Sequence, residues 1–282
     1  MTLERDGFLS DTIVGLANEA WKSLYPKHVA LVERVNRFAI AVSATPRDLQ
    51  RRDADLFAAL FLARAIQDFH AAVLLGKWGL RAQSRAMVRA TFETALYCVA
   101  ASQDLMLKNG AWKKAKKDAS PAIRFIDAFE AAHQRFRRQV ATEVRTMGYL
   151  PPDQEAMLSA LLRDLGPLGG EQDIDVRGLA EDLGLSSLYT NIYRPLSQDA
   201  HPTATSLEHH VALNPARRIT GLRSGPDYLQ IEDTLALAIC SLITALQGFL
   251  ERFGTQDEST ELQALVAAYA VLLEGSAGPS GP

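Results

Sequence analysis

The sequence predicts an all-α protein, a helical bundle with long antiparallel central helices and short peripheral helices. Apolar residues recur at helical spacing through most of the chain, whereas the alternation typical of strands is almost absent. Residues 56–75 are apolar on nearly every side, which marks a central helix of a bundle. Gly76 and Gly79 leave only a short turn before the next helical stretch, over residues 80–100, and so tight a connection makes the two helices antiparallel.

The bulk composition is that of an ordinary soluble globular protein. The 282 residues are 48% hydrophobic and 22% charged, and they are enough to bury a substantial core. We expect one helical domain over residues 1–274, with its core at about 47–253, and a disordered tail over residues 275–282. The net charge of -3 excludes a generally basic nucleic-acid coat but leaves local basic patches open.

Charge and apolar patterning favour a cytoplasmic protein without a membrane partner. The first residues carry acids and lack the apolar segment of a secretory signal. The longest apolar run, residues 235–250, is interrupted by polar residues and is shorter than a membrane span of about 20 residues. Cys98 and Cys240 lie in apolar helical runs, so we expect buried free thiols. No histidine stands in a metal-ligand spacing, so no metal or cofactor is expected.

Helix start and stop signals divide the first half of the chain. Ser10 and Asp11 can cap a helix that runs to about residue 23, and Pro26 starts a second helix that runs to about residue 42. Thr45 and Pro46 form a cap and first-turn pair for the long apolar helix, which ends near residue 75. The helix after it is expected to end at residues 109–110, where Asn precedes Gly.

The second half contains shorter elements followed by two apolar helices. Helices are expected over residues 121–147, 151–165, 176–183 and 187–199. Residues 214–228 lack helical periodicity and predict a surface loop or small hairpin, whose candidate nucleic-acid contacts are Arg217, Arg218 and Arg223. Helices over 229–253 and 261–274 follow. Their apolar faces exceed what a peripheral helix needs, which favours a homodimer.

A polar stripe crosses the apolar helix over residues 80–100. Its members recur every four residues and therefore share one slowly drifting face: Arg81, Arg85, Arg89, Glu93 and Tyr97. Core-type residues flank the stripe, so it is not an ordinary solvated face. Buried charges need partners, and we expect the stripe to contact a second polar segment.

The best counterpart is the segment over residues 193–201. Arg194 and His201 are seven residues apart, about two helical turns, and lie on nearly the same face. An arginine that binds a phosphate and a histidine that moves a proton are the minimum for cleaving RNA by attack of its 2′ hydroxyl.

A structural alternative stays open for the same residues. In it, a polar network locks two helices together, and its members are Arg89, Glu93, Tyr193, Ser197 and His201. The protein would then be a non-enzymatic binding or interaction module whose cluster is structural or holds a small anionic ligand. Either way, we expect Glu93 within hydrogen-bond reach of at least one other member.

The stretch from Arg194 to His201 is similar to the R-x(4–6)-H motif of the HEPN superfamily, although Pro195 stands where a polar residue is usual. HEPN domains are all-α bundles, often dimers, and many are metal-independent ribonucleases of toxin–antitoxin, abortive-infection or other defence systems. The resemblance implies an RNA substrate, an antitoxin or defence partner, and Arg194 and His201 as catalytic residues. The supporting cluster would be Arg85, Arg89, Glu93, Tyr193 and Ser197.

A second resemblance covers more of the chain, roughly residues 53–253. The stretch RAMVRATFETALYC, followed about 100 residues later by YRPLSQDAH, resembles a widespread bacterial family of unknown function. Members of that family show an R-x-x-x-E helix and a later Y-x-x-L-S-x-x-x-H segment. The matching positions here are Arg89, Glu93, Tyr193, Leu196, Ser197 and His201. This resemblance implies a shared fold but brings no established activity.

Overall fold

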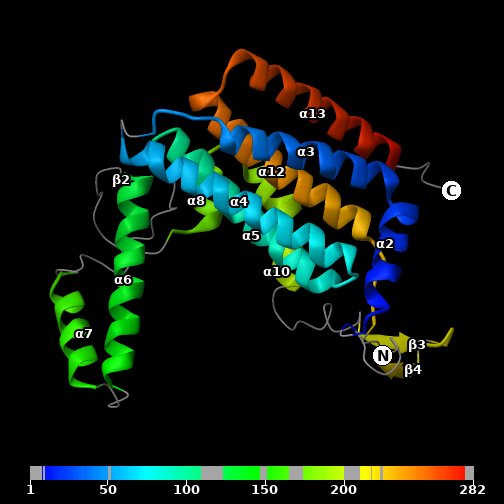
Figure 1. The fold of residues 1–282 in the computed structure, drawn as a ribbon, viewed down its shortest axis with the longest axis horizontal. Coiled ribbons are helices and arrows are strands. Elements are labelled where there is room, and N and C mark those ends of the chain that lie inside the picture. The colour runs from blue at the N-terminus through cyan, green and yellow to red at the C-terminus, as the bar shows by residue number, and fades with distance from the viewer. Residues whose placement is uncertain are drawn as a thin grey trace. The chain divides into compact units, whose positions relative to one another are not determined.

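The computed structural model confirms the all-α class (Figure 1). It describes residues 8, 10–49, 52–108, 123–146, 151–164, 174–199, 210–216, 218–222 and 225–276. Strands in these residues form only two antiparallel pairs, β1 with β2 and β3 with β4. Contacts divide the chain into two compact units, residues 1–103 with 187–282 and residues 104–186. A single domain over residues 1–274 stays a prediction.

The first unit holds the long helices. Its described elements are α2 (Ile13–Leu24), α3 (Pro26–Ala44), α4 (Asp53–Lys77), α5 (Arg81–Ser102), the π-helix η2 (Tyr189–Tyr193), α10 (Arg194–Asp199), β3 (Val211–Leu213), β4 (Ile219–Leu222), α12 (Ile231–Phe253) and α13 (Gln256–Ser276). α4, α5 and α12 pack on one another, and α3 and α13 lie beside α12 (Figure 1). The β3–β4 pair is the small hairpin expected in this region.

α4 and α5 form the antiparallel hairpin that the glycine turn predicts. Thr94 on α5 donates to Asp68 Oδ2 on α4 at 3.3 Å. Ser84, which precedes Thr94 on α5, donates at 2.7 Å to the carbonyl of Ala72, which follows Asp68 on α4. Gly79 closes the turn with a φ of 72°, which glycine adopts without steric cost. The prediction that these two helices are in contact and antiparallel is therefore confirmed.

α12 approaches α5 very closely at one point. A Cβ added to Gly248 would lie 2.6 to 2.9 Å from atoms of Val99, so no larger residue fits there without movement. Nearby, the Cys98 thiol lies 3.4 Å from the carbonyl oxygen of Ala58 and 3.6 Å from that of Ala245. Complete burial raises the pKa of the Cys98 thiol to about 12, so this free thiol stays protonated, as expected of a core residue.

Burial explains the long apolar run of α12 and part of that of α4. By length and composition alone, both helices could cross a membrane. In the fold, 78% of the most apolar window of α12 and 44% of that of α4 is buried inside the protein. Core helices of soluble proteins show the same composition, so packing within the unit accounts for the apolar surface of α12.

Helix boundaries differ from expectation at two places. α4 begins at Asp53 and not at Pro46, because the described part of the preceding segment is extended and Arg47 in it binds other helices. α5 ends at Ser102, and Asp104 follows with a positive φ of 48°, a conformation that does not continue a right-handed helix. The expected stop at residues 109–110 lies outside the described residues.

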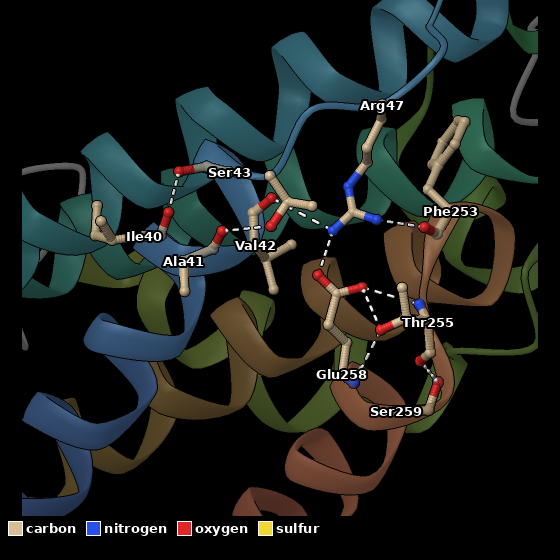
Figure 2. A network of polar contacts seen from close by, with 10 residues as sticks. Ile40, Ala41, Val42, Ser43, Arg47, Phe253, Thr255, Glu258 and Ser259 are labelled. Carbon is tan, nitrogen blue, oxygen red and sulfur yellow. Dashed lines mark hydrogen bonds and ion pairs between the residues drawn. The ribbon is translucent and has the colours of Figure 1, made fainter.

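A polar clamp joins the ends of three helices (Figure 2). Arg47, whose side chain is only 8% exposed, donates to the carbonyl of Phe253 at the end of α12 and to that of Val42 on α3. It also pairs with Glu258, on α13. Glu258 accepts a hydrogen bond from the Thr255 N–H, while Thr255 Oγ1 accepts one from the Glu258 N–H. This reciprocal capping box starts α13 at Gln256, five residues before the expected start.

The second unit is described by itself. Its elements are β1 (Met106–Leu107), β2 (Ile123–Arg124), α6 (Phe125–Thr146), α7 (Pro152–Asp164) and α8 (Val176–Asp182). α6 and α7 form a hairpin in which Arg145 Nε lies 2.9 Å from Glu155 Oε1. β1 pairs with β2, and Asp104 accepts a hydrogen bond from Arg124 beside them. Short α9 (Ser186–Leu188) falls at the boundary between the two units.

The clamp predicts a large loss of stability for Glu258→Ala. The variant leaves the buried guanidinium of Arg47 without its carboxylate, so the free energy of unfolding should fall by about 3 kcal/mol. The matched control is Glu33→Ala, whose partner Arg37 lies 3.9 Å away at an exposed position. An exposed pair contributes less than about 1 kcal/mol, so this control should unfold nearly as wild type does. Urea titrations of both variants at pH 7 make the comparison, and equal losses would contradict it.

The same clamp predicts a pH dependence. Burial raises the pKa of Glu258, but hydrogen bonds from Arg47 and Thr255 outweigh it and leave the pKa below its usual value of 4.5. The stabilisation is therefore present above the unfolded pKa and is lost as pH falls through the folded pKa. The difference in unfolding free energy between wild type and Glu258→Ala should shrink between pH 5 and pH 2. A difference that stays constant over this range would be inconsistent with the carboxylate role.

Candidate functional site

The polar stripe of α5 lies at the edge of the core and not within it. Four of its members are half-buried: Arg85, Arg89, Glu93 and Tyr97. The fifth member, Arg81 at the start of α5, is only 7% exposed. It donates a hydrogen bond to Gln230 Oε1, at the start of α12, at 2.5 Å. The neighbours of the stripe, Val88 and Phe92, are fully buried. α5 therefore presents charged groups beside an apolar face that is packed into the core.

The segment expected to meet this stripe does so. η2 and α10 pack on α5, and the apolar anchors of this contact are Ile192, 2% exposed, and Leu196, fully buried. The ring of Tyr193 lies against that of Phe92, with the centroids 6.4 Å apart. Because these apolar contacts fix the short helices, the polar side chains between them are held in place.

Tyr193 is the centre of the polar cluster. Arg89 Nη2 donates to the Tyr193 hydroxyl at 2.6 Å, and the Arg89 guanidinium lies 4.7 Å from the centroid of the same ring. The hydroxyl in turn donates to Glu93 Oε2 at 3.4 Å. Tyr97 donates to the other carboxylate oxygen, Glu93 Oε1, at 3.0 Å. The expectation that Glu93 lies within hydrogen-bond reach of a cluster member is confirmed.

The electrostatics of the cluster keep the phenol protonated. Burial raises the pKa of Tyr193 and the Glu93 carboxylate raises it further, whereas the hydrogen bond from Arg89 lowers it; the net pKa is above the usual value of 10.0. A protonated hydroxyl can accept from Arg89 and donate to Glu93 at the same time. The cluster therefore links a cation to an anion through a neutral tyrosine and supplies no activated phenolate near pH 7.

A π-helical turn precedes Arg194. Within η2, the Arg194 N–H donates to the carbonyl of Tyr189, five residues earlier, and this is the wider spacing of a π-helix. The turn places the ring of Tyr189 against that of Tyr193, with centroids 5.1 Å apart and an interplanar angle of 22°. Tyr189 is not among the predicted site residues, although the aromatic pair at positions 189 and 193 is visible in the sequence.

The other predicted site residues are hydrogen-bonded, exposed or outside the described residues. Ser197 donates to the Tyr193 carbonyl at 2.8 Å, a bond within its own helical segment. Arg194 is exposed, and within the described part of the chain it has no hydrogen-bond or ion-pair partner. Arg218 is exposed beside β4, and its N–H donates to Asn214 Oδ1 at 2.9 Å.

Three predicted positions cannot be placed in the site. They lie outside the described residues: His201, Arg217 and Arg223. Among the described residues, no three His, Cys, Asp or Glu side chains lie together in a group that could hold a metal ion. The catalytic roles of Arg194 and His201 stay predictions.

The cluster predicts that Glu93→Ala destabilises the fold. Two half-buried hydroxyls, those of Tyr193 and Tyr97, would lose their acceptor, and the free energy of unfolding should fall by about 1 to 3 kcal/mol. Glu93→Gln is the matched control because its amide oxygen can still accept a hydrogen bond, so its loss should be smaller. Thermal and urea unfolding measure both variants, and an undiminished stability of Glu93→Ala would show that the network is dispensable.

Comparison with protein families identifies a related family. A family model described as a family of unknown function, DUF5677, matches residues 55–217, which include α4, α5 and the residues that form the polar cluster. No curated protein and no solved structure matches the chain. Since the family model spans more than half of the sequence, the chain belongs to the DUF5677 family.

Proposed function

We propose that this protein is a HEPN-like, metal-independent endoribonuclease of the bacterial cytoplasm that acts in a defence or toxin–antitoxin system. One observation carries the proposal. Arg194 is exposed, while the residue before it, Tyr193, is fixed to α5 by Arg89 and Glu93. A cation on a fixed backbone and without a described partner suits the binding of a phosphate group.

The proposed reaction needs two side chains. Arg194 binds the scissile phosphate and stabilises the charge that develops on its oxygens. His201, about two helical turns further along the sequence, takes the proton from the 2′ hydroxyl while solvent water protonates the leaving 5′ oxygen. With the two roles exchanged, His201 protonates the 5′ oxygen and water takes the proton from the 2′ hydroxyl. The 2′ oxygen forms a bond to phosphorus as the bond to the 5′ oxygen breaks, which yields a cyclic phosphate and a 5′ hydroxyl. No oxidant or metal enters this balance.

The other predicted residues take supporting roles in this proposal. Arg89 and Glu93 hold the segment through Tyr193, and Ser197 braces the carbonyl of Tyr193. Arg85 stands one turn before Arg89 on the same stripe. The arginines at 217, 218 and 223 would contact the RNA backbone, a role that the exposure of Arg218 allows.

A second function is favoured by the hydrogen bonds of the cluster itself. Arg89, Tyr193, Glu93 and Tyr97 bind one another, which explains these polar residues without any reaction. In this alternative the protein is a non-enzymatic binding or interaction module, and the cluster is structural or holds a small anion.

We further propose a homodimer and a partner protein encoded nearby, an antitoxin or defence component. Of the two apolar helices near the end of the sequence, α12 is mostly buried within its own unit, whereas α13 has exposed apolar residues. Val271 on this helix is 68% exposed and Leu273 is 43% exposed. A symmetric contact through α13 would cover both residues in each copy.

The ribonuclease proposal predicts that His201→Ala and Arg194→Ala each abolish RNA cleavage. Their melting temperatures should stay near that of wild type, because polar groups of active sites rarely stabilise the fold. Cleavage of a labelled RNA in excess chelator, with analysis for cyclic phosphate ends, measures the activity. The controls are His210→Ala and Arg37→Ala, which change exposed residues that are not part of the segment and should cleave normally.

Two results would decide against a ribonuclease. If wild type cleaves no RNA while His201→Ala lowers the melting temperature, the structural alternative holds. If both catalytic variants cleave RNA as wild type does, the activity belongs to other residues or to a contaminant.

The dimer proposal predicts that wild type scatters light as a dimer at micromolar concentration and that Val271→Glu scatters as a monomer. A charge in the contact cannot be desolvated cheaply, whereas it is harmless on a free surface. Leu74→Glu is the matched control, because Leu74 is 58% exposed on a different helix, α4, and this variant should stay dimeric. A monomeric wild type would refute the contact.

A further inference from the structure

A partly exposed aromatic ring belongs to the same helical segment as Arg194. Tyr189 is half-buried and stacks with one face on Tyr193. Within the described residues, no second ring or guanidinium contacts it. Tyr193 is itself held by Arg89 and Glu93, so the ring behind Tyr189 cannot move freely. Tyr189 is therefore an aromatic surface supported from behind.

The π turn joins the backbones of Tyr189 and the exposed Arg194. In an α-helix the N–H of a residue binds the carbonyl four residues earlier, but here the Arg194 N–H binds that of Tyr189, five residues earlier. A backbone hydrogen bond thus links the two residues across a single turn. π-helical turns are rare in proteins and are frequently found at functional sites.

The chemistry of this pair matches one nucleotide. A stacked aromatic ring offers a face to any base, and an exposed guanidinium offers hydrogen bonds to the adjacent phosphate. In a duplex the faces of the bases are covered by their neighbours, so such a surface accepts single strands. The protein as a whole carries a net charge of -3, so binding must depend on a local site of this kind and not on bulk attraction.

We propose that Tyr189 and Arg194 form a subsite for one nucleotide of single-stranded RNA, with the base stacked on Tyr189 and its phosphate bound by Arg194. The subsite rests on the proposed ribonuclease function and adds the substrate class to it. It explains why the tyrosine pair is stacked at the surface, which the hydrogen bonds of Arg89 and Glu93 do not require.

The test measures binding apart from cleavage. The probe is a fluorescent 2′-O-methyl oligouridine, which cannot be cleaved by 2′-hydroxyl attack, and the reference is an abasic oligonucleotide of equal length. Tyr189→Ala should weaken binding of the oligouridine about tenfold, the usual size of a lost stacking contact, and leave the abasic probe unaffected. Tyr189→Phe should bind as wild type does. Arg194→Ala should weaken binding of both probes, because it removes a phosphate contact.

Two further variants distinguish the loss of a base contact from the loss of the fold. Tyr189→Leu keeps an apolar side chain against Tyr193 but removes the aromatic face, so it should lose oligouridine affinity while circular dichroism shows an intact fold. Phe136→Ala, which removes a 64% exposed ring of the second unit, should bind both probes as wild type does.

The outcomes separate the subsite from the enzyme. If wild type cleaves RNA and binds the oligouridine but Tyr189→Ala and Tyr189→Leu bind it equally well, the subsite is wrong and the ribonuclease stands. If binding depends on Tyr189 but wild type cleaves no RNA, the subsite stands and the ribonuclease is wrong. If wild type prefers duplex RNA to the single strand, the base-stacking subsite is overturned.

Discussion

The close approach of α5 and α12 determines how the rest of the first unit is arranged. Gly248 leaves room for Val99, and α5 is thereby seated against α12 on one side and α4 on the other. Once these two sides of α5 are occupied, the stripe that carries Arg89 and Glu93 faces the remaining neighbour, the segment of η2 and α10. The polar cluster is thus a consequence of apolar packing: steric fit orients the helix, and hydrogen bonds then satisfy the groups left at its edge.

Much of this arrangement follows from sequence, because it rests on periodicity and on the cost of burying charge. The helical spacing over residues 56–75 and the glycine turn predict the central hairpin. The pairing of Glu93 with Tyr193 follows from a different argument. A carboxylate among apolar neighbours needs a partner, and the segment after residue 193 offers hydroxyl and guanidinium groups on one side of a helix. Both arguments use local chemistry that a single sequence displays.

Other features depend on contacts between distant residues and could not be predicted in this way. The cap signal at Thr45 and Pro46 indicates a helix start, but Arg47 binds the end of α12 and Glu258, more than 200 residues later, and the chain stays extended there. The site was likewise predicted only in part. The tyrosines at 189 and 193 are visible in the sequence, but the π turn that follows from the Arg194 N–H binding the Tyr189 carbonyl is not. His201 lies outside the described residues.

The π turn also has a consequence for how the site can change over time. A turn of η2 holds one residue more than the α-helical hydrogen-bond pattern would, and deletion of that residue would restore ordinary helix geometry without breaking the chain. Each residue in an α-helix is rotated by about 100° from the one before it, so the deletion would turn α10 by that angle relative to Tyr189. Arg194 would leave its place, and a neighbouring side chain would take it. The same rotation would carry Leu196, the fully buried anchor of α10, away from its contact with α5. The wide turn is therefore what allows Leu196 to be buried and Arg194 to be exposed at the same time.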